Sequence, residues 1–210
     1  MKLLLCRPFF IGCYILACTT ANSQSKLFFR EDWKEIPAAT PVTQEHVVNP
    51  NLILALYGPA KEQIKKSNHP PIPNDPYYIW SGDCKGNWAL SLSYRDKWVD
   101  LTGDAKIILR TRQSGFRQLH LILKLHTGDW LVSDQSVAYT PDWIEKEFKV
   151  VDLSWRKLNI ETVTEGSPVK NPDLSKVAEI GFTDLMSGGG TPASSRIDWI
   201  EVYGKDVNKK

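Results

Sequence analysis

Residues 117–133 read RQLHLILKLHTGDWLVS, and this stretch decides the fold. Apolar and polar residues alternate along its first half, which is the period of a β-strand with one buried face. Thr127-Gly128-Asp129 supplies turn chemistry before a second apolar run that begins at Trp130. The stretch therefore predicts a β-hairpin whose inward side chains are Leu119, Leu121, Leu123 and Leu125.

The residues between these leucines form the opposite face of the same strand, and they are Gln118, His120, Ile122, Lys124 and His126. The run just upstream, Ala105–Arg112, alternates in the same way and turns two arginines away from its apolar side. Only residues 113–116 join the two runs, so we expect neighbouring strands of one sheet. One surface would then carry Arg110, Arg112, Gln118, His120 and Lys124.

Similar short runs continue along the chain, separated by Gly, Pro, Asn and Asp, and almost none has helical period. We predict strands at Leu27–Glu31, Asn51–Tyr57, Tyr78–Ser81, Trp88–Tyr94, Ala105–Arg112, Arg117–Leu125, Trp130–Ser133, Ile144–Val151, Val177–Thr183 and Arg196–Tyr203. Lys61–Lys65 suits one helical turn, and the prolines after it predict an extended loop over Ser67–Pro76. The pattern predicts an all-β fold, namely a single antiparallel β-sandwich.

The N-terminus has the pattern of a signal peptide. An apolar run follows Lys2 and Arg7, and it is shorter than the roughly 20 residues that cross a bilayer as a helix. Two cleavage readings stay open. Cleavage after Ser23 would release the chain, whereas Ile15-Leu16-Ala17-Cys18 resembles a lipoprotein box that would tether the chain by acyl groups on Cys18. We therefore expect an exported protein that is periplasmic, extracellular or an outer-surface lipoprotein.

Composition limits the number of domains and the classes of partner that we expect. Removal of residues 1–23 takes away Lys2 and Arg7, which leaves 24 basic against 24 acidic residues. Such a neutral chain has no general attraction to nucleic acid or acidic lipid, so we expect membrane contact only through a lipid anchor. Cys84 is the only cysteine beyond the leader, so a hydrophobic core must stabilise the fold. We assign the sandwich to 24–204 and a polar tail to 205–210.

The two ends of the predicted domain carry a family resemblance. Leu27–Trp33 and Ser195–Tyr203 resemble the first and last strands of the galactose-binding-like jelly rolls. Three interior segments resemble consecutive strands of that superfamily, and they are Gly86–Leu92, Trp98–Gly103 and Ala105–Arg110. The resemblance implies a jelly roll of the carbohydrate-binding-module kind, although the superfamily also includes adaptors that bind no sugar.

The same resemblance implies a structural calcium between the first and last strands. The matching residues here are Glu31 or Asp32 together with Asp198, which offer the hard oxygen ligands that calcium prefers. In the alternative interpretation, Asp198 pairs with Arg196 or caps a sheet edge. We predict no other cofactor.

Tryptophans suit sugar binding because an aromatic face packs on the C–H side of a pyranose, but they suit a core equally well. Trp33, Trp88 and Trp199 alternate with apolar neighbours and are predicted to be structural. The remaining candidates lie beside turn residues and are predicted to be exposed, and they are Trp80, Trp130 and Trp143.

The predicted ligand site combines the basic sheet surface with two of these tryptophans. Its residues are Arg110, Arg112, Gln118, His120, Lys124, Trp130 and Trp143. We expect a polysaccharide or oligosaccharide as the ligand. Acidic glycans are among the candidates, because arginine binds carboxylate or sulfate through two parallel hydrogen bonds. In the alternative interpretation these residues bind no ligand and only form the solvated face of an antiparallel sheet.

Three functions remain open from the sequence. The first is a non-catalytic carbohydrate-binding domain that takes part in polysaccharide use. The second is a small lyase or dehydratase for uronic-acid oligosaccharides, with arginine neutralising the carboxylate and His120 moving the proton. The third is a structural adaptor of the cell envelope. Because no zinc-peptidase, zinc-ribbon or serine-hydrolase motif is present, the non-catalytic role is favoured, and the oligomeric state stays open.

Overall fold

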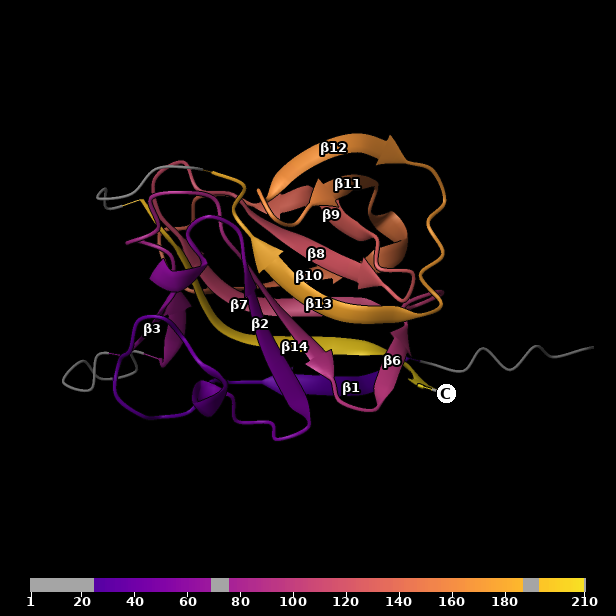
Figure 1. The fold of residues 1–210 in the computed structure, drawn as a ribbon, viewed down its shortest axis with the longest axis horizontal. Coiled ribbons are helices and arrows are strands. Elements are labelled where there is room, and N and C mark those ends of the chain that lie inside the picture. The colour runs from indigo at the N-terminus through magenta and orange to yellow at the C-terminus, as the bar shows by residue number, and fades with distance from the viewer. Residues whose placement is uncertain (1–24, 69–75, 187–192, 210) are drawn as a thin grey trace, which may run out of the picture.

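The computed structural model describes residues 25–68, 76–186 and 193–209, and this part of the chain is all-β (Figure 1). The predicted leader and most of the predicted loop Ser67–Pro76 lie outside the described residues. The strands are β1 Lys26–Glu31, β2 Leu52–Tyr57, β3 Lys65–Ser67, β4 Tyr78–Trp80, β5 Ala89–Tyr94, β6 Lys97–Asp100, β7 Lys106–Gln113, β8 Leu119–Leu125, β9 Trp130–Val137, β10 Ile144–Lys149, β11 Trp155–Asn159, β12 Thr164–Val169, β13 Val177–Thr183 and β14 Ser195–Asn208. Three 3-10 helices connect some of them, at η1 Gln44–His46, η2 Lys61–Gln63 and η3 Val150–Asp152. No helix in these ranges is long and apolar enough to cross a membrane.

Two antiparallel layers make up the sandwich. Sheet A has the order β10-β7-β14-β1, and the small strands β4 and β3 continue it beside the start of β14. Sheet B has the order β2-β5-β13-β8-β9-β11-β12. The predicted fold class, a single antiparallel β-sandwich, is confirmed.

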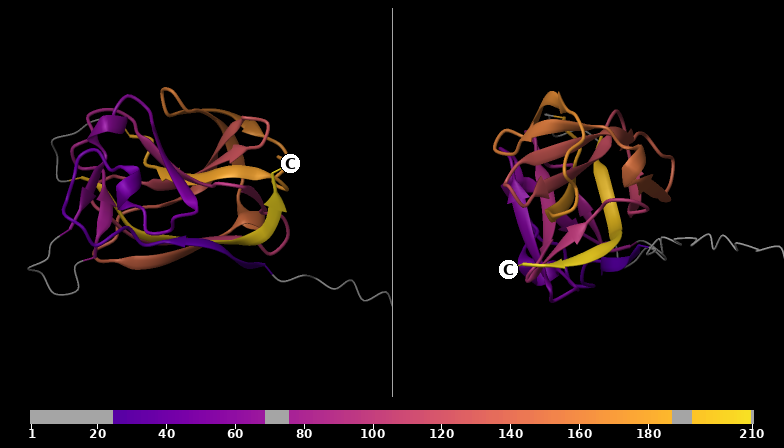
Figure 2. Two further views of the ribbon diagram at one scale, coloured as in Figure 1. Left: turned by 60° about the horizontal axis from the view of Figure 1, so that its bottom comes forward. Right: turned by 90° about the vertical axis from the view of Figure 1, so that its right-hand side faces the viewer.

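Strand β14 joins the two sheets. Its first part pairs with β7 and β1 in sheet A, and its last four residues, from Lys205, pair with β6 in sheet B. The left view of Figure 2 follows this yellow strand along one layer and into the other near its end. Gly204 lies at the change of sheet, where a Cβ atom would lie 2.5 Å from the Val99 side chain and 2.7 Å from the Asp100 carbonyl oxygen. The predicted polar tail over 205–210 was therefore wrong, because the strand continues to Asn208.

The core lies between the sheets and follows the alternation in residues 117–133. Leu119, Leu121 and Leu123 of β8 are fully buried there, and Leu109 of β7 belongs to the same cluster. Trp33 and Trp88 belong to this cluster, so their predicted structural role is confirmed. Trp199 is 9% exposed but lies outside it, with the Arg30 guanidinium 4.3 Å from its ring. Burial of such apolar area is the main force that stabilises a chain whose single described cysteine, Cys84, is free and buried.

The predicted pairing of β7 with β8 was wrong. Strand β7 pairs with β10 and β14 in sheet A, whereas β8 pairs with β13 and β9 in sheet B. The short link between them crosses from one layer to the other, with Gly115 in a left-handed conformation at φ 66°. Each strand buries its apolar side against the other across the core, so their outward side chains point to opposite sides of the molecule.

Candidate functional site

A pocket of about 530 Å³ lies on the outer face of sheet B, which is within the size range of small-molecule sites. Strands β8, β9, β11 and β12 contribute to it, together with the loop that follows β13. Its lining residues are Gln118, His120, Ser133, Asp134, Arg156, Glu165, Asp184, Leu185 and Met186.

Two predicted site residues, His120 and Gln118, lie side by side in this pocket with hydrogen-bonding groups to spare. The His120 Nδ1 atom lies 2.9 Å from the Ser133 carbonyl oxygen. Because a carbonyl oxygen only accepts, Nδ1 donates the proton, and in the tautomer that carries its proton on Nδ1 the Nε2 atom is the acceptor. The Gln118 carbonyl oxygen accepts from the Ser136 hydroxyl at 3.2 Å, which leaves the amide N–H groups for a ligand.

Three charged side chains complete the polar lining. The Asp134 Oδ1 atom accepts the Ser154 backbone N–H at 2.8 Å, so its second oxygen remains available. On the β11–β12 hairpin, Arg156 pairs with Glu165 at 3.2 Å, and both side chains are substantially exposed. Arg156 and Glu165 were not predicted as site residues, because strands β11 and β12 were themselves not predicted.

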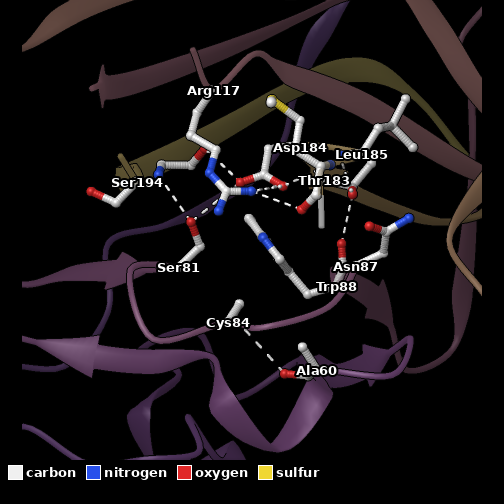
Figure 3. Close-up of polar contacts among 12 residues, drawn as sticks. Ala60, Ser81, Cys84, Asn87, Trp88, Arg117, Thr183, Asp184, Leu185 and Ser194 are labelled. Atoms are coloured by element: carbon white, nitrogen blue, oxygen red, sulfur yellow. Dashed lines mark hydrogen bonds and ion pairs between the residues drawn. The ribbon is translucent and has the colours of Figure 1, made fainter. Parts of the chain in front are cut away.

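A buried ion pair fixes the loop that forms one wall of the pocket (Figure 3). Asp184 is 1% exposed, lies 3.4 Å from the Arg117 guanidinium, and also accepts from the Ser81 and Ser195 hydroxyls. Arg117 donates to the Met186 carbonyl oxygen at 2.7 Å. Burial raises the pKa of Asp184, and the charge of Arg117 opposes that rise. This network holds Leu185 and Met186 at the rim.

The hairpin of β11 and β12 forms the opposite wall and covers part of sheet B. A second hydrophobic cluster lies beneath it, with Ile122 and Val132 from the sheet and Leu158 and Val163 from the hairpin. The Asn87 side-chain amide donates to the Val163 carbonyl oxygen at 2.8 Å. Since Ile122 lies between His120 and Lys124 on β8, the hairpin divides the outer face of sheet B into two halves.

The predicted site residues thus fall into three separate places. Only Gln118 and His120 line the pocket. Lys124 lies beyond the second hydrophobic cluster and pairs with Glu179 at 2.9 Å. Trp130 belongs to that cluster and is 8% exposed, so its predicted exposure was wrong.

Arg110, Arg112 and Trp143 belong to the opposite side of the molecule, on or next to the outer face of sheet A. The Arg110 guanidinium lies 5.2 Å from the centre of the Trp143 ring and forms an ion pair with Asp198. The predicted single basic surface was therefore wrong. Both β7 and β8 do turn cations outward, but they do so from different layers of the sandwich.

The residues expected to bind calcium do not form a cluster. The fully buried Glu31 carboxylate accepts three backbone N–H groups, from Trp33, Val48 and Asn49. Asp32 and Asp198 each have an arginine partner, Arg30 and Arg110 respectively. Across 25–68, 76–186 and 193–209, no three His, Cys, Asp or Glu side chains group in a way that could hold a metal ion. These contacts do not fit calcium, because it needs six to eight oxygen ligands.

Some solved structures resemble this chain, whereas no family model and no curated protein matches it. Among solved structures, a family 11 carbohydrate-binding module of Clostridium thermocellum matches with 15% identity and a TM-score of 0.47, over 82% of this chain and 97% of that one. A family 32 module of C. perfringens, in complex with galactose, matches with 15% identity and a TM-score of 0.38, over 73% and 93%.

An exo-β-agarase also matches, with 13% identity and a TM-score of 0.42, over 78% of this chain and 24% of that one. The ligand of the present chain is inferred from its own pocket.

Proposed function

We propose that this protein is a non-catalytic carbohydrate-binding domain that is exported and binds a neutral oligosaccharide in the pocket on sheet B. The observation that carries the proposal is the mixture of open hydrogen-bonding groups in one pocket. Gln118 offers N–H donors, His120 Nε2 is an acceptor, and one Asp134 oxygen is an acceptor without a partner among the described residues. Sugar hydroxyls both donate and accept, so they match such a mixture.

The apolar rim supports a sugar over a smaller polar ligand. Met186 is 37% exposed and lines the pocket together with Leu185, which gives the C–H side of a pyranose an apolar partner. Carbohydrate sites combine such a surface with a few fixed polar groups, and the Arg117–Asp184 network fixes this rim.

The permanent charges of the pocket favour a neutral ligand over an acidic one. Arg156 is paired with Glu165, and Asp184 is paired with Arg117, so the charge of Asp134 is left over. A carboxylate or sulfate would meet a slightly negative site. The acidic glycan expected from the sequence depended on Arg110 and Arg112, which lie on or next to the other sheet.

Calorimetric titration with neutral oligosaccharides tests the proposal. The panel includes a β-1,3-1,4-mixed-linked tetrasaccharide, agaro-oligosaccharides and galactose, and an oligogalacturonate serves as the acidic comparison. We expect His120→Ala and Asp134→Ala to weaken binding about tenfold or more, since each removes a hydrogen-bonding group. Arg112→Ala, on the opposite side of the molecule, is the matched control and should bind like the wild type.

Binding that is lost in Arg112→Ala and kept in His120→Ala would contradict this assignment. If the wild type binds no glycan and captures a stable protein partner, the adaptor function is favoured instead.

The lyase function is the second candidate, because His120 and Arg156 share the pocket and could supply a proton acceptor and a carboxylate partner. Arg156 is already paired with Glu165, and this carboxylate competes with a substrate carboxylate for the guanidinium. An absorbance assay for new carbon–carbon double bonds in uronic-acid oligosaccharides distinguishes the two functions. We expect no signal, and steady turnover that His120→Ala abolishes would replace the binding function with catalysis.

A further inference from the structure

A large aromatic side chain stands exposed next to the pocket and has no role in the fold. Phe116 is 88% exposed, which is the highest exposure among the large apolar side chains of the described residues. It lies in the turn between β7 and β8, two residues before Gln118. A fully solvated phenyl ring gains nothing from burial on folding, so both of its faces are free to pack on a ligand.

The backbone around Phe116 is rigid on both sides. Before it, the Ser114 backbone N–H donates to the Ser194 carbonyl oxygen at 3.0 Å. A Cβ atom on Gly115 would lie only 2.5 Å from the Ala193 side chain, so the turn packs closely on the start of β14. After it, Arg117 is 4% exposed and is held by Asp184. The ring is therefore presented by a fixed turn, which lowers the entropic cost of binding.

Phe116 lies close to the pocket along the chain. It belongs to the turn, whereas Gln118, two residues later, lines the pocket. Two residues of chain span at most about 7 Å, so the backbone of Phe116 lies within that distance of a pocket residue. Exposure alternates from the turn into the strand, with Phe116 and Gln118 exposed and Arg117 and Leu119 buried.

The turn that carries Phe116 is also connected to the rim of the pocket, through the chain and through a hydrogen bond. Arg117 follows Phe116 in the chain and donates to the Met186 carbonyl oxygen at 2.7 Å, and Met186 lines the pocket. The turn and the pocket rim therefore form one supported unit. A flat aromatic face beside a polar pocket matches the next pyranose of a bound chain, whose C–H groups pack on aromatic rings.

We propose that Phe116 is a stacking subsite for a further sugar ring of the oligosaccharide held in the pocket, so that the protein prefers longer chains. This inference rests on the proposed function. It adds that the ligand runs out of the pocket past Gln118 toward the β7–β8 turn.

A length series tests the subsite. Dissociation constants are measured by calorimetry for a disaccharide, a trisaccharide and a tetrasaccharide of the neutral series that the wild type binds, beginning with mixed-linked β-gluco-oligosaccharides. We expect Phe116→Ala to weaken the tetrasaccharide about three- to tenfold and to leave the shortest ligand that binds unchanged. Phe116→Tyr should keep the wild-type length preference, because it keeps the ring.

Leu27→Ala is the matched control, since Leu27 is 50% exposed and lies on β1 of sheet A. It should not change any constant. Equal binding of every length by Phe116→Ala and the wild type would overturn the subsite, as would an equal loss for every length. Loss of self-association in Phe116→Ala with unchanged glycan binding would assign the ring to a contact between copies. If the wild type binds no glycan, the proposed function itself fails, and that outcome is distinct from both.

Discussion

Lys66 is a charged side chain in an unusual position for a residue of its kind. It lies on the short strand β3 and is 0% exposed. Its ammonium group donates to the Ile36 carbonyl oxygen and lies 4.4 Å from the centre of the Tyr77 ring. Burial lowers the pKa of Lys66 to about 8, and the nearby charge of Glu35 opposes the change.

This lowered pKa predicts a pH-dependent contribution to stability. Between about pH 8 and the ordinary lysine pKa near 10.4, Lys66 is protonated in the unfolded chain and neutral in the folded one. The unfolded state then binds more protons, so the free energy of unfolding rises with pH through this window. Lys66→Met cannot titrate. Chemical denaturation at about pH 7 and about pH 10 should therefore show the wild type gaining stability relative to the variant.

Lys97→Met provides the control for this measurement. Asp206 raises the pKa of Lys97, so its folded-state value lies above the window and no such relative gain is expected. A constant difference between the wild type and Lys66→Met at both pH values would contradict the account of Lys66.

At the scale of elements, the β11–β12 hairpin decides the shape of the outer face of sheet B. Strand β12 is exposed along most of its length, and among the strands it pairs only with β11. Val163, at the turn of the hairpin, is fully buried and adopts φ 51°, which is an outlier for a β-branched residue. Tertiary contacts must hold it there, and the amide of Asn87 is one of them.

Removal of that amide should loosen the hairpin. Asn87→Ala leaves the buried Val163 carbonyl oxygen without its donor, so we expect a loss of about 1–2 kcal/mol in the free energy of unfolding. Hydrogen exchange of residues 158–164 should become faster, whereas exchange in sheet A should not change. Asn51→Ala is the control, because Asn51 is exposed. Unchanged exchange in the hairpin would mean that Asn87 does not anchor it.

The observed strands also show which parts of the fold could be predicted from the sequence alone. The alternating pattern predicted every described strand of seven or more residues, because one buried face imposes a period of two. It missed the shorter strands β3, β6, β11 and β12, and in β12 Gly166 and Pro168 interrupt an exposed run. It also paired β7 with β8, because a link between two sheets and a hairpin within one sheet leave the same alternation. Arg156 and Glu165 were missed because β11 and β12 were not predicted, although Ile122 and Val132 on the outward face already indicated a covering layer.

At the scale of the whole molecule, the two outer faces have different characters. The cations of sheet A are mostly neutralised, since Arg30 pairs with Asp32 and Glu201, and Lys106 pairs with Glu147. Exposed pairs of this kind contribute little to stability and leave few groups open for a ligand. Pockets of about 570 and 560 Å³ also border sheet A, but these ion-paired side chains line them. The pocket on sheet B instead keeps hydrogen-bonding groups without partners among the described residues.

Backbone NMR shift mapping during titration with a neutral oligosaccharide distinguishes the two sides of the molecule as ligand sites. We expect the largest shift changes on Gln118, His120, Asp134, Arg156 and Met186, with a further change at Phe116 when the chain is long enough. Changes centred on Arg110, Arg112 and Trp143 would place the ligand on the opposite side of the molecule and rule out the pocket on sheet B.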